Sequence, residues 1–194
     1  TDHHWTSAGA CLAYDVWSER TGGEAETEDG LVKNVVSDKF RGSLYSKILD
    51  ADSAYDEIWT YGLQKDDAFG SKDCTVTIDE KQQLDSIYDD EMLQKKDKYA
   101  YFLSGNYGQV HIQNQKAASK AKGKNILIIK DSFANSFVPF ATQDYENIYM
   151  VDLRYYNGDM KSYLQEHNIT DVLVLYNISN FISDRNLHKL TGGI

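Results

Sequence analysis

Three residues whose types suit acyl transfer stand at two distant points of this sequence. Asp2 and His4 lie two residues apart at the start, and Ser132 follows the apolar run 125–130. A serine hydroxyl becomes a useful nucleophile when a histidine takes its proton and a carboxylate orients that histidine. Side chains two apart in an extended segment point the same way, so Asp2 and His4 can act as a pair. The residues predict a serine-dependent site with Ser132 as nucleophile, His4 as base and Asp2 as orienting acid.

Both segments also have simpler interpretations. An Asp131–Ser132 pair after a strand is typical of a helix N-cap, and Asp2 and His4 could belong to a frayed terminus. Asp2, His3 and His4 carry groups that bind zinc, but adjacent histidines seldom chelate one ion well, and the sequence offers no second cluster with ligand spacing. We predict neither a metal nor an organic cofactor.

The C-terminal part of the chain carries the pattern that would position these residues. Apolar runs predict strands at residues 125–130, 147–153 and 171–176. The segments between them predict helices at 133–141, interrupted near Pro139, and 159–167. Successive strand–helix–strand units favour parallel strands with right-handed crossovers. We therefore predict an α/β fold with a doubly wound, mostly parallel sheet.

A polar residue follows each predicted strand: Ser132, Arg154 and Asn177. Ligands bind such sheets at the carboxyl ends of the strands, so we expect all three at one edge. The Ser132 N–H, at a strand-to-helix turn, and the Asn177 amide could both donate to an oxyanion. Arg154 suits an anionic or hydroxyl-rich ligand. The simpler alternatives are a turn residue for Asn177 and a surface ion pair for Arg154.

The rest of the sequence is less regular. Apolar spacing near 3.6 predicts a helix over 6–21, capped by Thr6 or Ser7 and ended by Gly22. Region 20–97 is interpreted as a less regular insertion that contains strands. Its apolar stretches lie at 35–36, 45–49, 57–61 and 74–78. Further segments predict a partial helix over 81–98 and strands over 99–103 and 109–112.

Composition excludes several classes of protein. The chain has 194 residues, 26% charged and 41% hydrophobic, which predicts a single folded domain over 1–194. A net charge of −10 argues against a nucleic-acid partner, because phosphate binding requires clustered Lys and Arg. No apolar run has the roughly 20 residues of a membrane span, and no signal peptide is visible. Cys11 and Cys74 could form a disulfide or remain unpaired core thiols.

Several segments resemble a known family. The opening Asp2-His3-His4-Trp5 resembles the signature of the DHHW proteins, relatives of alginate O-acetylation proteins within the SGNH hydrolase superfamily. The other segments that resemble this family are 130–137, 151–157 and 174–181. The resemblance covers residues 1–15 and about 98–190. The motif order, acid and base first and serine later, resembles the circularly permuted order of those relatives.

The resemblance implies a flavodoxin-like SGNH fold and a role for each matching residue. Ser132 resembles the nucleophile, His4 the base and Asp2 the acid, while Asn177 resembles the oxyanion-hole asparagine and Gly158 is nearest to the glycine donor. The residues that resemble substrate-binding positions are Arg154, Tyr155 and Asn106. Two departures stand out. Lys130 replaces a small residue, and the N-terminal strands expected to complete the domain are absent from this chain.

The leading interpretation is an O-acetyltransferase or acetylesterase acting outside the cytoplasm on a cell-surface or secreted polysaccharide. The resemblance implies a membrane protein that delivers the acyl group, and secretion or anchoring through a segment absent from this chain. The alternative is a non-catalytic carbohydrate-binding or scaffold protein of the cell surface. The 14 tyrosines of this chain would suit stacking against sugars, although tyrosines more often pack in the core and on the surface.

Overall fold

A six-stranded mixed sheet forms the centre of the molecule. The computed structural model describes residues 1–191. The strand order is β4-β3-β5-β7-β6-β8. The strands are β3 (Cys74–Ile78), β4 (Gln82–Leu84), β5 (Gln109–Asn114), β6 (Asn125–Lys130), β7 (Asn147–Val151) and β8 (Asp171–Leu175). The main helices are α1 (Ser7–Thr21), α3 (Ala134–Ala141), α4 (Met160–Glu166) and α5 (Ile178–Ser183).

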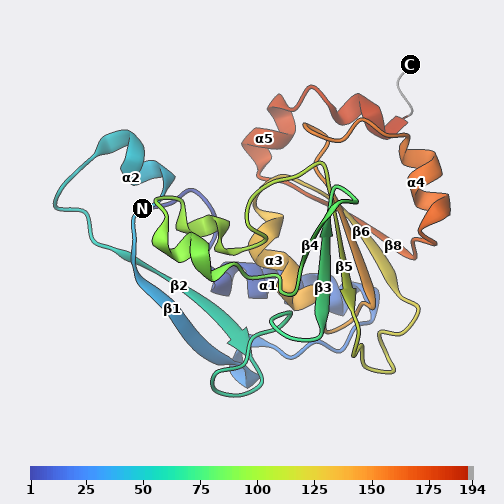
Figure 1. The fold of residues 1–194 in the computed structure, drawn as a ribbon, viewed down its shortest axis with the longest axis horizontal. Coiled ribbons are helices and arrows are strands. Elements are labelled where there is room, and N and C mark those ends of the chain that lie inside the picture. Colours follow the sequence, from blue (N-terminus) through green and yellow to red (C-terminus); the bar gives the residue numbers. More distant parts are fainter. Residues whose placement is uncertain (192–194) are drawn as a thin grey trace.

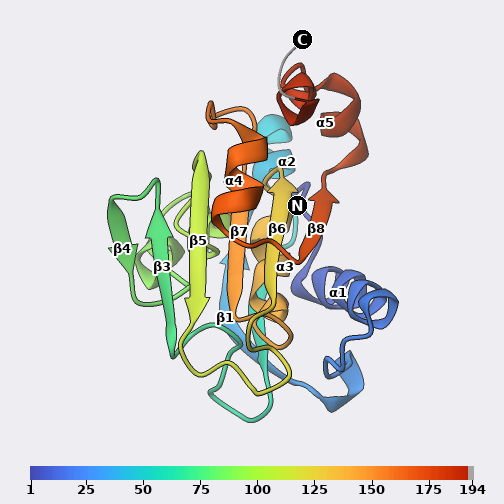
Figure 2. The ribbon, with the colours of Figure 1, turned by 90° about the vertical axis from the view of Figure 1, so that its right-hand side faces the viewer.

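Helices cover both faces of the sheet, as Figures 1 and 2 show. Alternate residues of β6 face opposite ways, as the pleat requires. Ile126 and Ile128 belong to a core cluster with α1 and α3, whereas Leu127 and Ile129 pack in a second cluster with α4. The buried strand therefore reads as a continuous apolar run rather than an alternating one.

The sheet is only partly parallel. β7, β6 and β8 run parallel, as predicted, but β4, β3, β5 and β7 are joined by antiparallel pairings. The prediction of a mostly parallel sheet is therefore wrong for half of it. β3 and β4 are joined by a tight turn with positive φ at Asp79 and Glu80, and such a turn needs no crossover helix.

The first part of the predicted insertion, residues 32–62, forms a separate ribbon beside the main sheet, whereas its later strands β3 and β4 belong to that sheet. The strands of the ribbon, β1 (Val32–Phe40) and β2 (Asp56–Gly62), pair with each other alone (Figure 1). The short helix α2 (Ser43–Ile48) connects them, so the apolar stretch 45–49 is helical rather than extended. The remaining elements are single 3-10 turns: η1 (Glu28–Gly30), η2 (Asp90–Gln94), η3 (Lys98–Tyr101) and η4 (Leu187–Thr191).

Most of the predicted elements are confirmed with small boundary shifts. Thr6 caps α1, and Gly22 ends it in the left-handed conformation. The strand predicted over 99–103 is wrong, because these aromatic residues form η3 and pack into a local cluster instead of a ladder. α3 continues two residues past Pro139 and ends at Ala141. The error at 99–103 has a simple cause: a short apolar run contains no long repeat, so its pattern cannot separate a 3-10 turn from a strand.

Two further features complete the fold. Cys11 and Cys74 are both buried and unpaired, so the thiol interpretation holds over the disulfide. Across residues 1–191, no helix has both the length and the apolar character to traverse a bilayer.

Candidate active site

The predicted acid, base and nucleophile form one hydrogen-bonded chain. His4 Nδ1 lies 2.6 Å from Asp2 Oδ2, and His4 Nε2 lies 2.8 Å from Ser132 Oγ. A carboxylate can only accept, so Nδ1–H donates to Asp2 and the Nε2 lone pair accepts from the Ser132 hydroxyl. The side chains of His4 and Asp2 are 9% and 10% exposed, which shields both bonds from water. This is the arrangement that allows His4 to take the serine proton.

Asp2 is held by the segment that follows β1. The Ser43 N–H donates to Asp2 Oδ1 at 2.8 Å, and the Tyr45 N–H donates to the Thr1 carbonyl at 3.0 Å. Burial alone would raise the pKa of Asp2, but hydrogen bonds from His4 and Ser43 outweigh it and hold the pKa well below its usual range. The insertion therefore orients the carboxylate and keeps it ionised.

Ser132 is placed by the turn between β6 and α3. The buried Asp131 accepts from the Phe133 N–H through Oδ1, and from the Asn177 N–H and Asn180 Nδ2 through Oδ2. These bonds tie the turn to the start of α5. Ser132 does not cap α3, because its hydroxyl faces His4. Its N–H has no hydrogen-bond partner within residues 1–191, so it can receive an oxyanion.

An aromatic residue outside the predicted site joins the base to the nucleophile. The Tyr99 ring stacks on His4 with centroids 3.6 Å apart and planes 3° apart. Its hydroxyl donates to the Ser132 carbonyl at 2.9 Å. Trp5 Nε1 donates to the Phe133 carbonyl at 2.9 Å, which fixes the next residue of the turn. Sequence reasoning missed Tyr99 because it lay within a segment interpreted as a strand.

The predicted oxyanion donors beyond Ser132 lie at helix starts. Asn177 Oδ1 accepts from the Ser179 N–H at 2.9 Å and caps α5, which leaves its Nδ2 without a bond among the described residues. Gly158 directly precedes Asp159, the N-cap of α4. None of the hydrogen bonds within residues 1–191 joins Asn177 or Gly158 to Ser132, so both roles stay predictions.

Arg154 is locked to a buried carboxylate. Its Nε and Nη2 donate to Asp152 at 2.9 and 2.6 Å, and Asp152 is fully buried. Hydrogen bonding to Asp152 raises the pKa of Arg154, so the guanidinium stays charged. It borders a pocket of about 390 Å³ that Asp131 also lines, and the neighbouring Tyr155 is exposed. The ion pair is therefore built in rather than a loose surface contact, and the exposed part of Arg154 can meet a ligand.

Lys130, the departure from the family pattern, is buried at the end of β6. Its ammonium donates to Asn106 Oδ1 at 2.9 Å and to Asn135 Oδ1 at 2.7 Å. Burial lowers its pKa to about 8, against the attraction of Asp152. The lysine thus fastens the turn that carries Asn106 to the first turn of α3. Asn106, predicted to bind substrate, uses its carbonyl oxygen in this contact.

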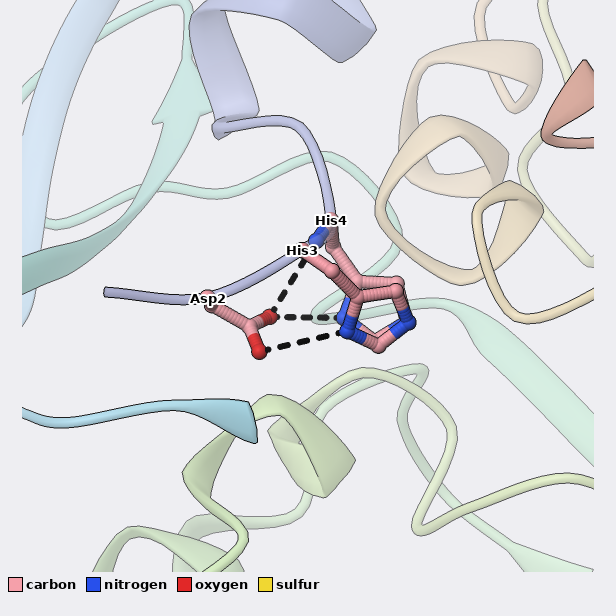
Figure 3. A group of neighbouring side chains, drawn as sticks. All are labelled: Asp2, His3 and His4. Atoms are coloured by element: carbon pink, nitrogen blue, oxygen red, sulfur yellow. Dashed lines mark hydrogen bonds and ion pairs between the residues drawn. The ribbon is translucent and has the colours of Figure 1, made fainter. Parts of the chain in front are cut away.

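Asp2, His3 and His4 also bring three metal-binding groups together. One ligand atom from each lies within 4.8 Å of the others, and Figure 3 shows the Asp2 carboxylate facing both rings. However, both His4 ring nitrogens already have partners, and His3 Nδ1 lies 2.5 Å from Ser43 Oγ. A cation there would have to break the bond between Asp2 and His4, so the group is better suited to proton transfer.

The fold and site define a class: α/β proteins in which a serine, a histidine and a carboxylate meet at one edge of a sheet. A model of the DHHW protein family matches residues 1–151. The chain belongs to the DHHW family.

Two solved structures extend the comparison. A DHHW family protein from Eubacterium siraeum DSM 15702 aligns with a TM-score of 0.80 and 23% identity, over 100% of this chain and 63% of that one. Bacillus cereus PatB1 with a sulfonyl adduct aligns with a TM-score of 0.72 and 27% identity, over 95% of this chain and 61% of that one. This chain thus spans about three-fifths of the length of each. No curated protein matches the sequence significantly.

Proposed function

We propose that this protein is a serine-dependent acyltransferase or esterase of the SGNH type, acting on acetyl groups of an extracytoplasmic polysaccharide. The observation that supports it is the chain of hydrogen bonds from Asp2 through His4 to Ser132. The likeness to Bacillus cereus PatB1, whose structure carries a sulfonyl adduct, adds support. Sulfonyl groups become attached to proteins at activated nucleophiles, and Ser132 contacts a histidine whose other ring nitrogen is bonded to a carboxylate.

The proposed reaction has two halves. His4 Nε2 takes the hydroxyl proton as Ser132 Oγ attacks the acetyl carbonyl carbon, and the Ser132 N–H with the Asn177 amide receives the oxyanion. His4 then protonates the departing oxygen, which leaves an acetyl-serine. A sugar hydroxyl or a water molecule, deprotonated by His4, attacks that ester and restores Ser132. The buried, ionised Asp2 stabilises the imidazolium in both halves.

The biological setting belongs to the proposal as well. Family resemblance favours a permuted SGNH domain over 1–194, a location outside the cytoplasm and a membrane partner that delivers the acyl group. The exposed part of Arg154, in the pocket that Asp131 also lines, suits a hydroxyl-rich acceptor.

Hydrolysis of 4-nitrophenyl acetate tests the activity. We expect Ser132→Ala to lower kcat by about 10³-fold or more, because the nucleophile is lost. Ser119→Ala, on an exposed turn, is the matched control and is expected to behave as wild type. A sulfonyl fluoride should label wild type at Ser132 and leave Ser132→Ala unlabelled, as detected by peptide mass spectrometry. Equal rates in wild type and Ser132→Ala would instead favour the non-catalytic carbohydrate-binding alternative.

A further inference from the structure

A pocket of about 410 Å³ opens beside the acid and base. Its lining includes His3 and His4 together with Arg41, Lys47 and Lys96. These cationic residues come from the end of β1, from α2 and from the segment after η2, three parts of the chain that no sequence motif connects. The pocket is large enough for a small acid or a single sugar ring and reaches the base that contacts Ser132.

The lysines of this pocket are not neutralised by the protein. Lys47 and Lys96 are exposed, and neither forms an ion pair with a carboxylate in the described part of the chain. Asp2 and Asp97 are the acidic side chains of the lining, and the ionised Asp2 keeps its charge, so two negative charges face the three positive charges of Arg41, Lys47 and Lys96. The positive charge of Lys47 also contributes to the lowered pKa of His3, after burial and the charge of His4. The lining therefore carries an excess of positive charge.

Arg41 adds a fixed positive charge to the lining. Its Nη1 donates to the Tyr45 hydroxyl, and its Nη2 donates to the carbonyls of Ala51 and Ser53. Its Nε is buried and has no hydrogen-bond partner among the described residues. Because this atom is closed to solvent, and the guanidinium lies 4.5 and 4.3 Å from the centroids of the Tyr45 and Tyr55 rings, Arg41 gives the lining a fixed charge rather than a free donor.

The net negative charge of the whole chain makes this cationic lining distinctive. Acidic residues outnumber basic ones by 30 to 20, so an anion is repelled over much of the surface. The cationic lining next to the triad is a place where this protein can attract one. An uncharged substrate would leave both lysines without a partner.

We propose that this pocket binds the anionic group, a carboxylate or a phosphate, of the substrate whose acyl chemistry takes place at Ser132. The inference rests on the proposed function and narrows its substrate class: the acyl donor or acceptor carries a negative charge close to the reacting ester. Lys47 and Lys96 bind the charge, and the fixed guanidinium of Arg41 adds to the attraction.

Two aryl acetates that differ in one charge test the pocket. The rates of phenyl acetate and 4-acetoxybenzoate, each divided by its rate with hydroxide alone, give a charge preference. We expect wild type to favour the carboxylate ester by about threefold or more in kcat/KM at low salt, with the preference falling as salt rises. The double variant Lys47→Gln/Lys96→Gln should lose that preference, whereas Lys161→Gln, an exposed lysine of α4, should keep it. A preference that is absent in wild type, or intact in the double variant, would overturn the proposal.

A binding measurement separates this proposal from the proposed function. Ser132→Ala is titrated with 4-hydroxybenzoate, phenyl phosphate and phenol, with NMR shifts followed at the His3 and His4 amides. The pocket predicts that either anion binds more tightly than phenol, and the tighter of the two identifies the group. Equal weak binding of all three refutes the anion pocket even if the esterase is active. Selective anion binding without any Ser132-dependent hydrolysis supports the pocket and refutes the enzyme.

Discussion

At the scale of single residues, Tyr99 is a side chain that contacts both the base His4 and the nucleophile Ser132. Its ring covers one face of His4, and its hydroxyl holds the carbonyl of Ser132. A small displacement of the base from its nucleophile lowers the catalytic rate by a large factor. A residue that fixes both groups can therefore affect the rate without contacting the substrate. Tyr99 therefore acts as a positioning residue.

Two substitutions separate the contributions of the ring and the hydroxyl. Tyr99→Phe keeps the stacked ring and loses the bond to Ser132, so we expect a fall in kcat of a few-fold and a loss of about 1 kcal/mol in the free energy of unfolding. Tyr99→Leu loses both, and we expect kcat to fall by more than about tenfold. Ester hydrolysis and urea unfolding measure the two effects.

Tyr101→Leu is the matched control for those variants. Tyr101 is buried on the same 3-10 turn and stacks on Tyr88, away from His4. It should lose comparable stability while folded protein keeps its kcat. If Tyr99→Leu retained full kcat, the positioning role would be excluded.

At the scale of elements, the loop between β1 and α2 decides where the acid lies. Gly42 has ordinary extended backbone angles, so its importance is steric rather than conformational. A Cβ built at this position would lie 2.5 Å from the Asp2 Cγ, which leaves no room for any other residue without moving the carboxylate. The ribbon of the insertion is thus part of the candidate site.

Gly42→Ala tests that role of the loop. We expect the displaced Asp2 to lose its bond with His4 and kcat to fall by about 10²-fold, with a smaller change in stability. Gly30→Ala is the control, because its Cβ would meet only the flexible end of Glu26. Steady-state hydrolysis measures kcat for both variants. A Gly42→Ala variant with the kcat of wild type would show that Asp2 can be held without this loop.

The elements that carry Ser132 were predictable, and those that carry its partners were not. The runs 125–130 and 171–176 predicted strands close to the observed β6 and β8. β6 is buried on both faces and reads as an unbroken apolar run, whereas β8 is an edge strand that keeps an apolar run although Val172 and Val174 are exposed. The strands predicted for segments 45–49 and 99–103 were wrong, because apolar residues of both segments pack in local helical turns. Local patterns do not contain the contacts that choose between these states.

At the scale of the whole molecule, partly buried histidines link stability to pH. Burial lowers the pKa of His3 and His111 from the ordinary 6.5, with smaller contributions from the charges of His4 and His167. A folded-state pKa below the unfolded value means that the unfolded chain binds more protons between the two values. The free energy of unfolding should therefore fall as pH drops from about 6.5 through the folded pKa values. Asp2 adds a further loss at still lower pH, because its pKa is also lowered.

Urea unfolding at about pH 7.5 and about pH 5.5 measures this dependence. We expect wild type to be less stable at the lower pH. His111→Gln should reduce the difference, because it removes one histidine whose pKa burial lowers, and His111 stacks on Tyr149 rather than on a residue of the candidate site. A wild-type stability that is flat or rising toward pH 5.5 would contradict the burial effect.

The sequence by itself determined the types and order of Asp2, His4 and Ser132, and the strand end at which the serine lies. These follow from short-range patterns: an apolar run, a turn, and a two-residue spacing. Only the tertiary structure decided that the acid and base reach the serine, that Gly42 and Ser43 hold the carboxylate, and that Tyr99 stacks on the base. The physical reason is distance along the chain. Each of these contacts joins segments tens of residues apart, and packing of whole elements, rather than any local propensity, brings them together.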